Sequence, residues 1–140
     1  MAAYFADTSW IGLSRKRDQH HDRAVEWYQR AIATGSTIVT TEAVLLEWLN
    51  ALSDVSTRRM AAESYARVRL DARIEVVLFQ IELMAAAVEL YGTRPDKTRS
   101  LTDCFSFVVM ERRGLSEALT TDHDFEQAGL KALMLVEAPS

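Results

Sequence analysis

Residues 2–9 read Ala-Ala-Tyr-Phe-Ala-Asp-Thr-Ser, and this stretch decides how the rest of the chain is interpreted. A short apolar run that stops at a charge is typical of a strand buried inside a sheet. The run lacks the basic start of a signal peptide and reaches its first charge at Asp7. Residues 2–6 are therefore expected to form the first strand, with Asp7 at its carboxyl end.

Strand and helix patterns alternate after this first strand. Further strands are expected at 37–40, 74–77, 117–120 and 132–136. Helices are expected at 8–13, with a break at 14–19, and then at 21–33, 42–53, 57–71, 80–91 and 100–113. This alternation predicts an α/β fold with a mostly parallel central sheet of about five strands, flanked by helices on both faces. In such sheets the functional site lies beyond the carboxyl ends of the strands.

The composition limits the possible classes of protein. A chain of 140 residues with 49% hydrophobic residues fits one domain, 1–140, with a real core. The net charge of -4 argues against a protein that coats nucleic acid non-specifically, although it does not exclude a nuclease. A single cysteine, Cys104, and the lack of a membrane-spanning apolar run favour a cytoplasmic protein.

Four acidic residues stand where an α/β fold would gather them. Asp7 and Asp122 each follow a strand, Glu47 lies within an apolar helix, and Asp103 begins another helix. Carboxylates that are brought together repel one another and resist losing water, so such a set usually holds a divalent cation. Because all the donors are oxygens, the expected ion is Mg²⁺, with Mn²⁺ as a possible substitute.

Two of these acids have a competitor nearby. Glu42 precedes Glu47, but it lies in the first turn of its helix, where the helix dipole already favours a carboxylate. Glu47 has apolar helical neighbours and no such explanation, so it is the preferred candidate. Asp124 follows Asp122, but the first residue after the strand is better placed to face the cleft. Whether Glu42 or Asp124 joins the site stays open at this point.

The other two acids also have a purely structural interpretation. Asp7 could cap the helix that follows it, as aspartate often does. Ser100-Leu-Thr-Asp103 resembles a capping box with aspartate in place of glutamate. The helical neighbours of Asp103, Phe107 and Met110, are apolar, which favours a side chain that leans towards the core.

The four fragments that carry the acids resemble the PIN domain family when they are taken together. They are residues 4–9, residues 39–50, residues 100–107 and residues 119–129. Their order and spacing cover nearly the whole chain, and a short chain of this kind is similar to the VapC toxins of toxin–antitoxin pairs. The resemblance implies a metal-dependent endoribonuclease, a homodimer, and a small antitoxin partner whose tail blocks the pocket, often with an arginine.

The resemblance also implies roles for individual residues. Asp7 and Asp103 would bind Mg²⁺ directly, and Glu47 and Asp122 would complete the pocket through water or a second metal. Nearby hydroxyl groups would hold the carboxylates or the attacking water: Thr8 or Ser9, and Thr121. Two other functions remain as alternatives: a non-catalytic interaction module with the same fold, and a phosphohydrolase that acts on a small molecule.

Basic residues on either side of Asp103 are candidates for contacts with RNA phosphates. They are Arg94, Lys97, Arg99, Arg112 and Arg113. The alternative interpretation of each is solvated surface charge.

Overall fold

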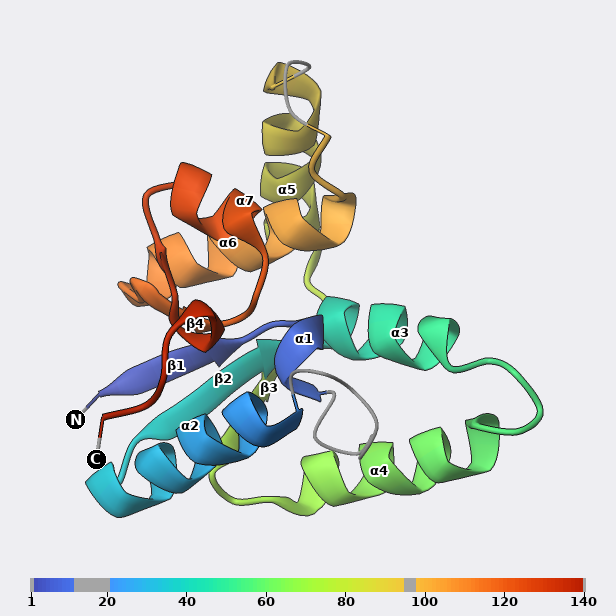
Figure 1. Ribbon diagram of the computed structural model, residues 1–140. Helices are drawn as coiled ribbons and strands as arrows, with labels where there is room; N and C mark the ends of the chain where they lie inside the picture. Colours follow the sequence, from blue (N-terminus) through green and yellow to red (C-terminus); the bar gives the residue numbers. More distant parts are fainter. Residues whose placement is uncertain (1, 12–20, 95–97, 140) are drawn as a thin grey trace.

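The computed structural model describes residues 2–11, 21–94 and 98–139 (Figure 1). Its five strands form one sheet in the order β3-β2-β1-β4-β5, and all four pairings are parallel. The strands are β1 (Ala3–Ala6), β2 (Thr37–Thr41), β3 (Ile74–Val77), β4 (Glu117–Leu119) and β5 (Lys131–Ala132). The predicted fold class and sheet direction are confirmed.

The first apolar run becomes the central strand, β1. Phe5 pairs with Val39 of β2 on one side and with Ala118 of β4 on the other. Phe5 and Ala6 have no solvent exposure, which explains why the run contains no polar residue before Asp7. The end of β1 therefore delivers Asp7 to the middle of one edge of the sheet.

Helices cover both faces of the sheet, as the sequence predicts. They are α1 (Thr8–Ile11), α2 (His21–Thr34), α3 (Glu42–Ala51), α4 (Arg58–Leu70), α5 (Ile81–Thr93), α6 (Leu101–Arg113) and α7 (His123–Gln127). In Figure 1, α5, α6 and α7 lie on one side of the sheet, and α2 and α4 lie on the other. Within the described residues, no helix has the length and apolar character needed to cross a bilayer.

The end of the chain differs from the prediction of a strand at 132–136. Only Lys131–Ala132 pair with β4, and a 3₁₀ turn follows at Leu133–Leu135. The apolar residues of this run become buried by crossing the end of β4, where the Met134 N–H donates to the Thr120 carbonyl oxygen at 3.2 Å. The Trp27 indole N–H donates to the Val136 carbonyl oxygen and ties the segment to α2. An apolar run alone does not distinguish these two ways of covering a core.

Several smaller boundaries also differ by one or two residues. Helix α5 continues through Gly92 to Thr93, where the sequence predicted an end at Gly92. Strand β4 stops at Leu119, one residue earlier than predicted. The expected break at 14–19 lies outside the described residues.

Helix α6 is the most deeply buried helix element on its side of the sheet. Every residue from 103 to 110 is buried, and the Phe107 ring packs edge-on against Phe125 with 4.9 Å between ring centroids. Ser100 caps its start, and Gly114 ends it with φ of 65°. Because both ends are fixed, the position of Asp103 in the first turn is fixed as well.

We expect Gly114→Ala to lower the free energy of unfolding by about 1 kcal/mol, because a side chain in the left-handed region clashes with its own backbone. Gly114→Asn is the matched control, since asparagine tolerates this conformation and should cost clearly less. Urea unfolding of the two variants checks this. Equal losses would show that the conformation at this position is not what limits stability.

Candidate metal and catalytic site

Three of the four predicted acids come together at one edge of the sheet. Oxygens of Asp7, Asp103 and Asp122 all lie within 4.8 Å of one another. Asp7 ends β1, Asp122 follows the neighbouring strand β4, and Asp103 lies in the first turn of α6. Parallel pairing of β1 with β4 places their carboxyl ends side by side, so the topology accounts for the convergence.

Asp7 is the most buried of the three acids, with 5% of its surface exposed. Its Oδ2 accepts a hydrogen bond of 2.9 Å from the Thr120 hydroxyl. Its Oδ1 is buried and has no hydrogen-bond partner in the part of the chain that the structure describes. Burial raises the pKa of the Asp7 carboxyl to about 7. Hydrogen bonds from the Thr8 backbone and the Thr120 hydroxyl offset part of this rise, and the charges of Asp103 and Glu47 add to it. An ionised carboxylate oxygen that is buried without a hydrogen bond lowers the stability of the fold unless a cation binds it.

Asp103 caps α6 and also belongs to the acidic group. Its backbone N–H donates to the Ser100 hydroxyl at 3.1 Å, and its Oδ2 accepts from the Ser100 N–H at 3.4 Å. Burial, followed by the charge of Asp122, raises the pKa of the Asp103 carboxyl to about 6. The two interpretations of this residue are therefore compatible, since the cap fixes the side chain that faces the other acids.

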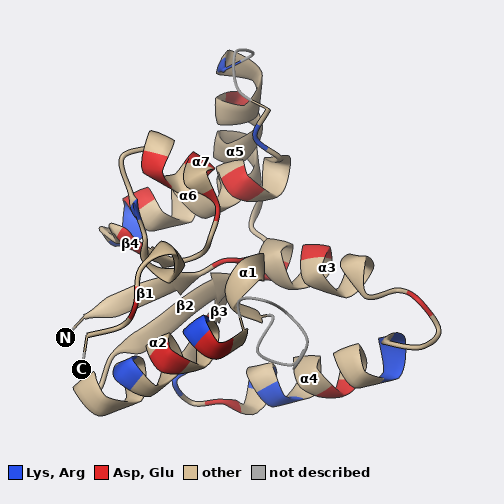
Figure 2. Cartoon of the chain, viewed as in Figure 1, with Lys and Arg blue, Asp and Glu red and all other residues tan. Residues whose placement is uncertain are grey.

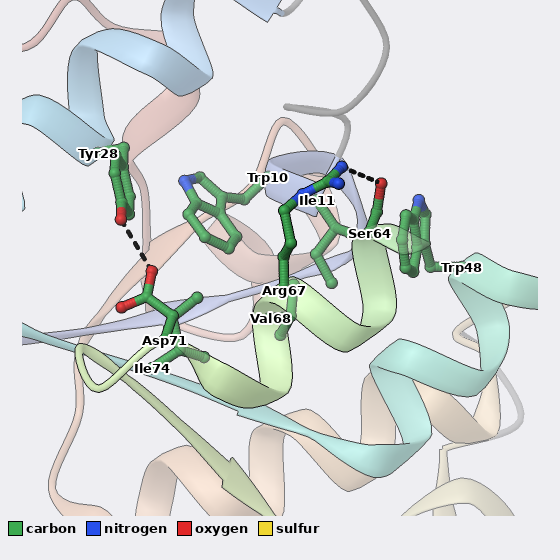
Figure 3. Close-up of a pocket in the computed structure, with 9 residues that line it drawn as sticks. All are labelled: Trp10, Ile11, Tyr28, Trp48, Ser64, Arg67, Val68, Asp71 and Ile74. Atoms are coloured by element: carbon green, nitrogen blue, oxygen red, sulfur yellow. Dashed lines mark hydrogen bonds between the residues drawn. The ribbon is translucent and has the colours of Figure 1, made fainter. Parts of the chain in front are cut away.

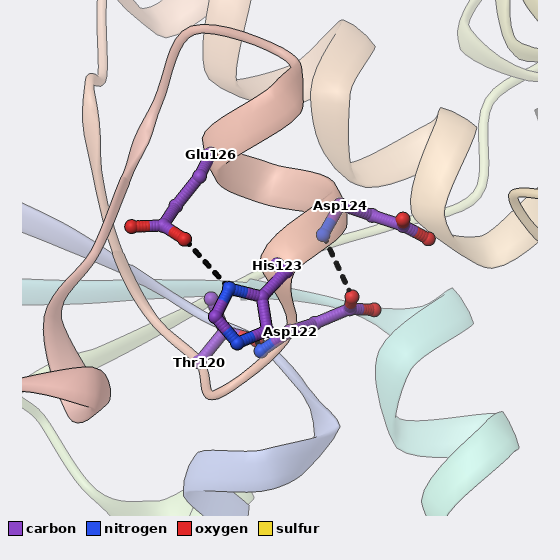
Figure 4. A network of polar contacts seen from close by, with 5 residues as sticks. All are labelled: Thr120, Asp122, His123, Asp124 and Glu126. Carbon is purple, nitrogen blue, oxygen red and sulfur yellow. Dashed lines mark hydrogen bonds and ion pairs between the residues drawn. The ribbon is translucent and has the colours of Figure 1, made fainter.

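Asp122 caps the short helix α7, as Figure 4 shows. Its Oδ1 accepts a hydrogen bond of 2.8 Å from the Asp124 N–H. The Asp124 carboxylate is not part of the group of three. The neighbouring His123 is exposed and pairs with Glu126 on the surface.

Glu47 lies next to the group, but it is not one of the three acids whose oxygens lie within 4.8 Å of one another. The Thr8 hydroxyl donates to Glu47 Oε1 at 2.9 Å, which links α3 to the residue that follows Asp7. The charge of Glu47 raises the pKa of both Asp7 and Asp103, so it is close enough to act on them. Glu42 instead accepts a hydrogen bond from the Phe79 N–H. The geometry favours Glu47 over Glu42 as the fourth acid.

Hydroxyl groups form hydrogen bonds with the acids, but one of these hydroxyl groups was not among those expected from the sequence. Thr120, which was not singled out, donates to Asp7 and accepts a hydrogen bond of 3.1 Å from the Asp122 N–H. Its side chain therefore sets the spacing of these two acids. Ser9 and Thr121 share a hydrogen bond of 3.2 Å with each other, which ties α1 to the segment after β4.

The basic residues expected to contact RNA are mostly engaged elsewhere. Arg112 pairs with Glu82, and Arg113 pairs with Glu75, at the end of α6 opposite Asp103. That end is about 15 Å from Asp103 at the helical rise of about 1.5 Å per residue. The alternative of solvated surface charge fits these two arginines better, since their side chains are 43% and 42% exposed. Figure 2 shows basic residues in blue at this end of α6.

The basic residues before Asp103 are Arg94, Lys97 and Arg99. The Arg99 guanidinium lies 5.2 Å from the centre of the Phe107 ring and stays at the start of α6. Arg94 takes part in an interaction of its own. Lys97 lies outside the described residues. Of the described residues in this set, Arg99 lies nearer to Asp103 along the chain.

The structure has two hollows of similar size, of which one reaches Glu47. A groove of about 310 Å³ between α3, α5 and α6 is lined by Glu47 and by Thr102, the neighbour of Asp103. A second cavity of about 220 Å³ lies among α1 to α4, where Tyr28 donates to Asp71 and Arg67 donates to Ser64 (Figure 3). None of the four acids lines the second cavity, whereas Glu47 lines the groove.

Residues 4–131 match the PIN domain. The chain belongs to the PIN domain family. It is 29% identical to the 23S rRNA-specific endonuclease VapC20 of two Mycobacterium tuberculosis strains over 126 residues, which cover 89% of this chain and 93% of VapC20. The residues that match the PIN domain thus include nearly the whole sheet and all four acids.

Solved structures of this PIN family are also similar. The crystal structure of Mycobacterium tuberculosis VapC20, titled a Sarcin-Ricin loop cleaving toxin, has a TM-score of 0.79 and 28% identity and covers 92% of this chain and 97% of its own. VapBC2 from Rickettsia felis, bound to a DNA fragment from its promoter, shares the fold with a TM-score of 0.67 at 16% identity, over 89% of this chain and 92% of that one. The family and VapC20 together make this chain a VapC-like PIN toxin, an endoribonuclease by class.

We expect the metal-free protein to lose stability as the pH rises from about 4 to about 7. The folded state raises the pKa of Asp7 from 3.8 to about 7, so in this range the native protein binds a proton that the unfolded chain has released. Asp7→Asn should therefore raise the free energy of unfolding by about 2–4 kcal/mol at about pH 8, since one pKa unit corresponds to about 1.4 kcal/mol.

Urea unfolding in a chelator at several pH values measures this difference. Asp54→Asn, which changes an exposed acid, is the control and should follow the wild type. If the free energy of unfolding of Asp7→Asn varies with pH as that of the wild type does, burial does not raise the pKa of the Asp7 carboxyl.

Proposed function

We propose that this PIN domain, which spans residues 1–140, is a metal-dependent toxin that cuts ribosomal RNA, with Asp7, Asp103 and Asp122 as the ligands of Mg²⁺. The observation that carries the proposal is the buried, unpartnered Oδ1 of Asp7 within 4.8 Å of two other carboxylates. A structural role would leave every buried carboxylate oxygen hydrogen-bonded. An ion would offset the repulsion that raises the pKa of these acids.

The donor set fits a hard cation. All three proposed ligands are carboxylate oxygens, which suit Mg²⁺ and Mn²⁺ better than the softer metals that prefer sulfur or imidazole. The Thr120 hydroxyl donates to the Asp7 carboxylate and the Ser100 backbone N–H donates to the Asp103 carboxylate, as outer residues do at metal sites.

In the proposed reaction, different residues of the chain have different roles. When bound, a divalent ion supplies a water of lowered pKa and offsets the charge that develops on the phosphodiester. Glu47 is the acid outside the group of three, and Thr8 orients it, so it is placed to accept a proton from the attacking water. Arg99, at the start of α6, is placed to hold a phosphate of the substrate.

The relatives support the proposed substrate class and the proposed partner. VapC20 is named for cleavage of 23S rRNA and of the sarcin–ricin loop, so we assign a ribosomal RNA stem-loop as the substrate class. A small antitoxin is the proposed partner, and the resemblance to the VapC toxins implies that its tail would lie across the acidic site. The presence of all four acids favours catalysis over a non-catalytic interaction module.

Asp103→Asn is expected to lower the rate of RNA cleavage by on the order of 100-fold or more, because a lost site charge affects both the ion and the transition state. Glu42→Gln is the matched control, since this acid lies outside the group, and its rate should stay within a few-fold of the wild type. Cleavage assays in Mg²⁺, with calorimetric titration of Mn²⁺, separate lost binding from lost chemistry. Equal rates for the two variants would contradict the assignment.

Brief expression in cells, followed by mapping of new RNA ends, tests the substrate class. We expect cuts in one loop of the large ribosomal RNA, and none with Asp7→Asn. Cuts confined to transfer or messenger RNA would reject the ribosomal target while leaving the nuclease assignment in place. The absence of any cut, with folded protein present, would count against both.

A further inference from the structure

The cavity of about 220 Å³ among α1 to α4 is separate from the acidic group. We call it the aromatic cavity, because three of the residues that line it carry aromatic rings: Trp10, Tyr28 and Trp48 (Figure 3). The centroids of the Trp10 and Tyr28 rings lie 5.8 Å apart, and the rings are tilted by 37°. Aliphatic side chains also line the cavity: Ile11, Val68 and Ile74. Flat apolar walls of this kind suit a ring-shaped ligand.

The aromatic walls are held firmly by the fold. Trp10 is 2% exposed and Trp48 is 3% exposed, and the Tyr28 hydroxyl donates to Asp71 Oδ2 at 2.8 Å. The indole N–H groups of both tryptophans are buried and have no hydrogen-bond partner among the described residues. Buried donors without a partner are uncommon in folded proteins. The residues of the aromatic cavity therefore include donors that the described part of the chain does not satisfy.

Arg67 supplies the one unpaired charge of the aromatic cavity within the described residues. Its Nη2 donates to the Ser64 hydroxyl at 3.0 Å, and no described carboxylate forms an ion pair with it. The Asp71 carboxylate is already engaged, because one oxygen accepts from Tyr28 and the other accepts from the Arg73 N–H at 2.8 Å. An anionic group on the ligand would thus meet an arginine that has free donors.

We propose that the aromatic cavity binds a small aromatic carboxylate. The ring lies against the Trp10, Tyr28 and Trp48 side chains, and the carboxylate accepts hydrogen bonds from the Arg67 guanidinium. Pockets for drug-sized ligands usually measure about 300–1,000 Å³, and this cavity of about 220 Å³ is smaller. Its size selects one or two fused rings with a short acid arm over a nucleotide.

The aromatic cavity adjoins the hydrogen bond that orients Glu47. Trp10 lies in α1 together with Thr8, and Trp48 follows Glu47 in α3. The Thr8 hydroxyl donates to Glu47 Oε1 at 2.9 Å and so joins α1 to α3. A ligand that contacts both helices lies close to this link. We therefore expect the backbone amide signals of Thr8 and Glu47 to respond when the ligand binds.

NMR of the metal-free, nitrogen-labelled protein during titration with indoleacetate tests the site. We expect the indole N–H signals of Trp10 and Trp48 to shift along one binding curve with the amides of Thr8 and Glu47. Trp27 is the internal control, because it does not line the cavity and its indole N–H donates to the Val136 carbonyl oxygen. Indoleacetamide, which has the same shape but no charge, should bind about tenfold more weakly.

Arg67→Gln should weaken the binding of indoleacetate by about tenfold or more, because it removes the charge that the carboxylate meets. Arg69→Gln is the matched control, since Arg69 is exposed on the same helix and does not line the cavity. Its affinity should stay within about twofold of the wild type, because exposed charges away from a site contribute little. Calorimetric titration measures both affinities, and circular dichroism confirms that both variants are folded.

Three results would overturn the proposal: no response of the Trp10 and Trp48 signals to millimolar indoleacetate, equal affinities for the acid and its amide, or equal losses in the two arginine variants. Tighter binding of N-acetyltryptophanamide than of indoleacetate would also overturn it, by assigning the cavity to a side chain of a protein partner. Because the measurements require neither metal nor RNA, their failure is distinct from failure of the nuclease assignment.

Discussion

The cost of placing three carboxylates together, one of them deep in the protein, is the constraint on which the rest of the site depends. Asp7 is held so far from water that the pKa of its carboxyl rises to about 7, and one of its oxygens has no partner among the described residues. Folding must overcome this penalty from elsewhere in the molecule. A divalent ion would remove the penalty, so the site is better suited to the metal-bound state than to the free one.

The rest of the fold holds this unfavourable group in place. The central strand β1 is buried on both faces and cannot move away, and α6 is locked by its cap and by its buried residues. Thr120 contacts two of the acids at once and fixes the distance between them.

Most of the framework could be predicted from the sequence, because strong local patterns agree with the final fold. Alternating strands and helices gave the parallel sheet, and acids at strand ends had to meet at its edge. Thr120 escaped notice because its role depends on where β4 stops, and strand ends are poorly marked by apolar runs. The last strand was overestimated for the same reason, and the partners of Arg112 and Arg113 are distant in sequence.

Diffraction from crystals soaked in Mn²⁺, with data collected at the manganese absorption edge, tests the central claim most directly. The account predicts an anomalous peak at coordination distance from oxygens of Asp7, Asp103 and Asp122, and no such peak in crystals of Asp7→Asn. A peak elsewhere, or an empty group of acids in the presence of the ion, would contradict it.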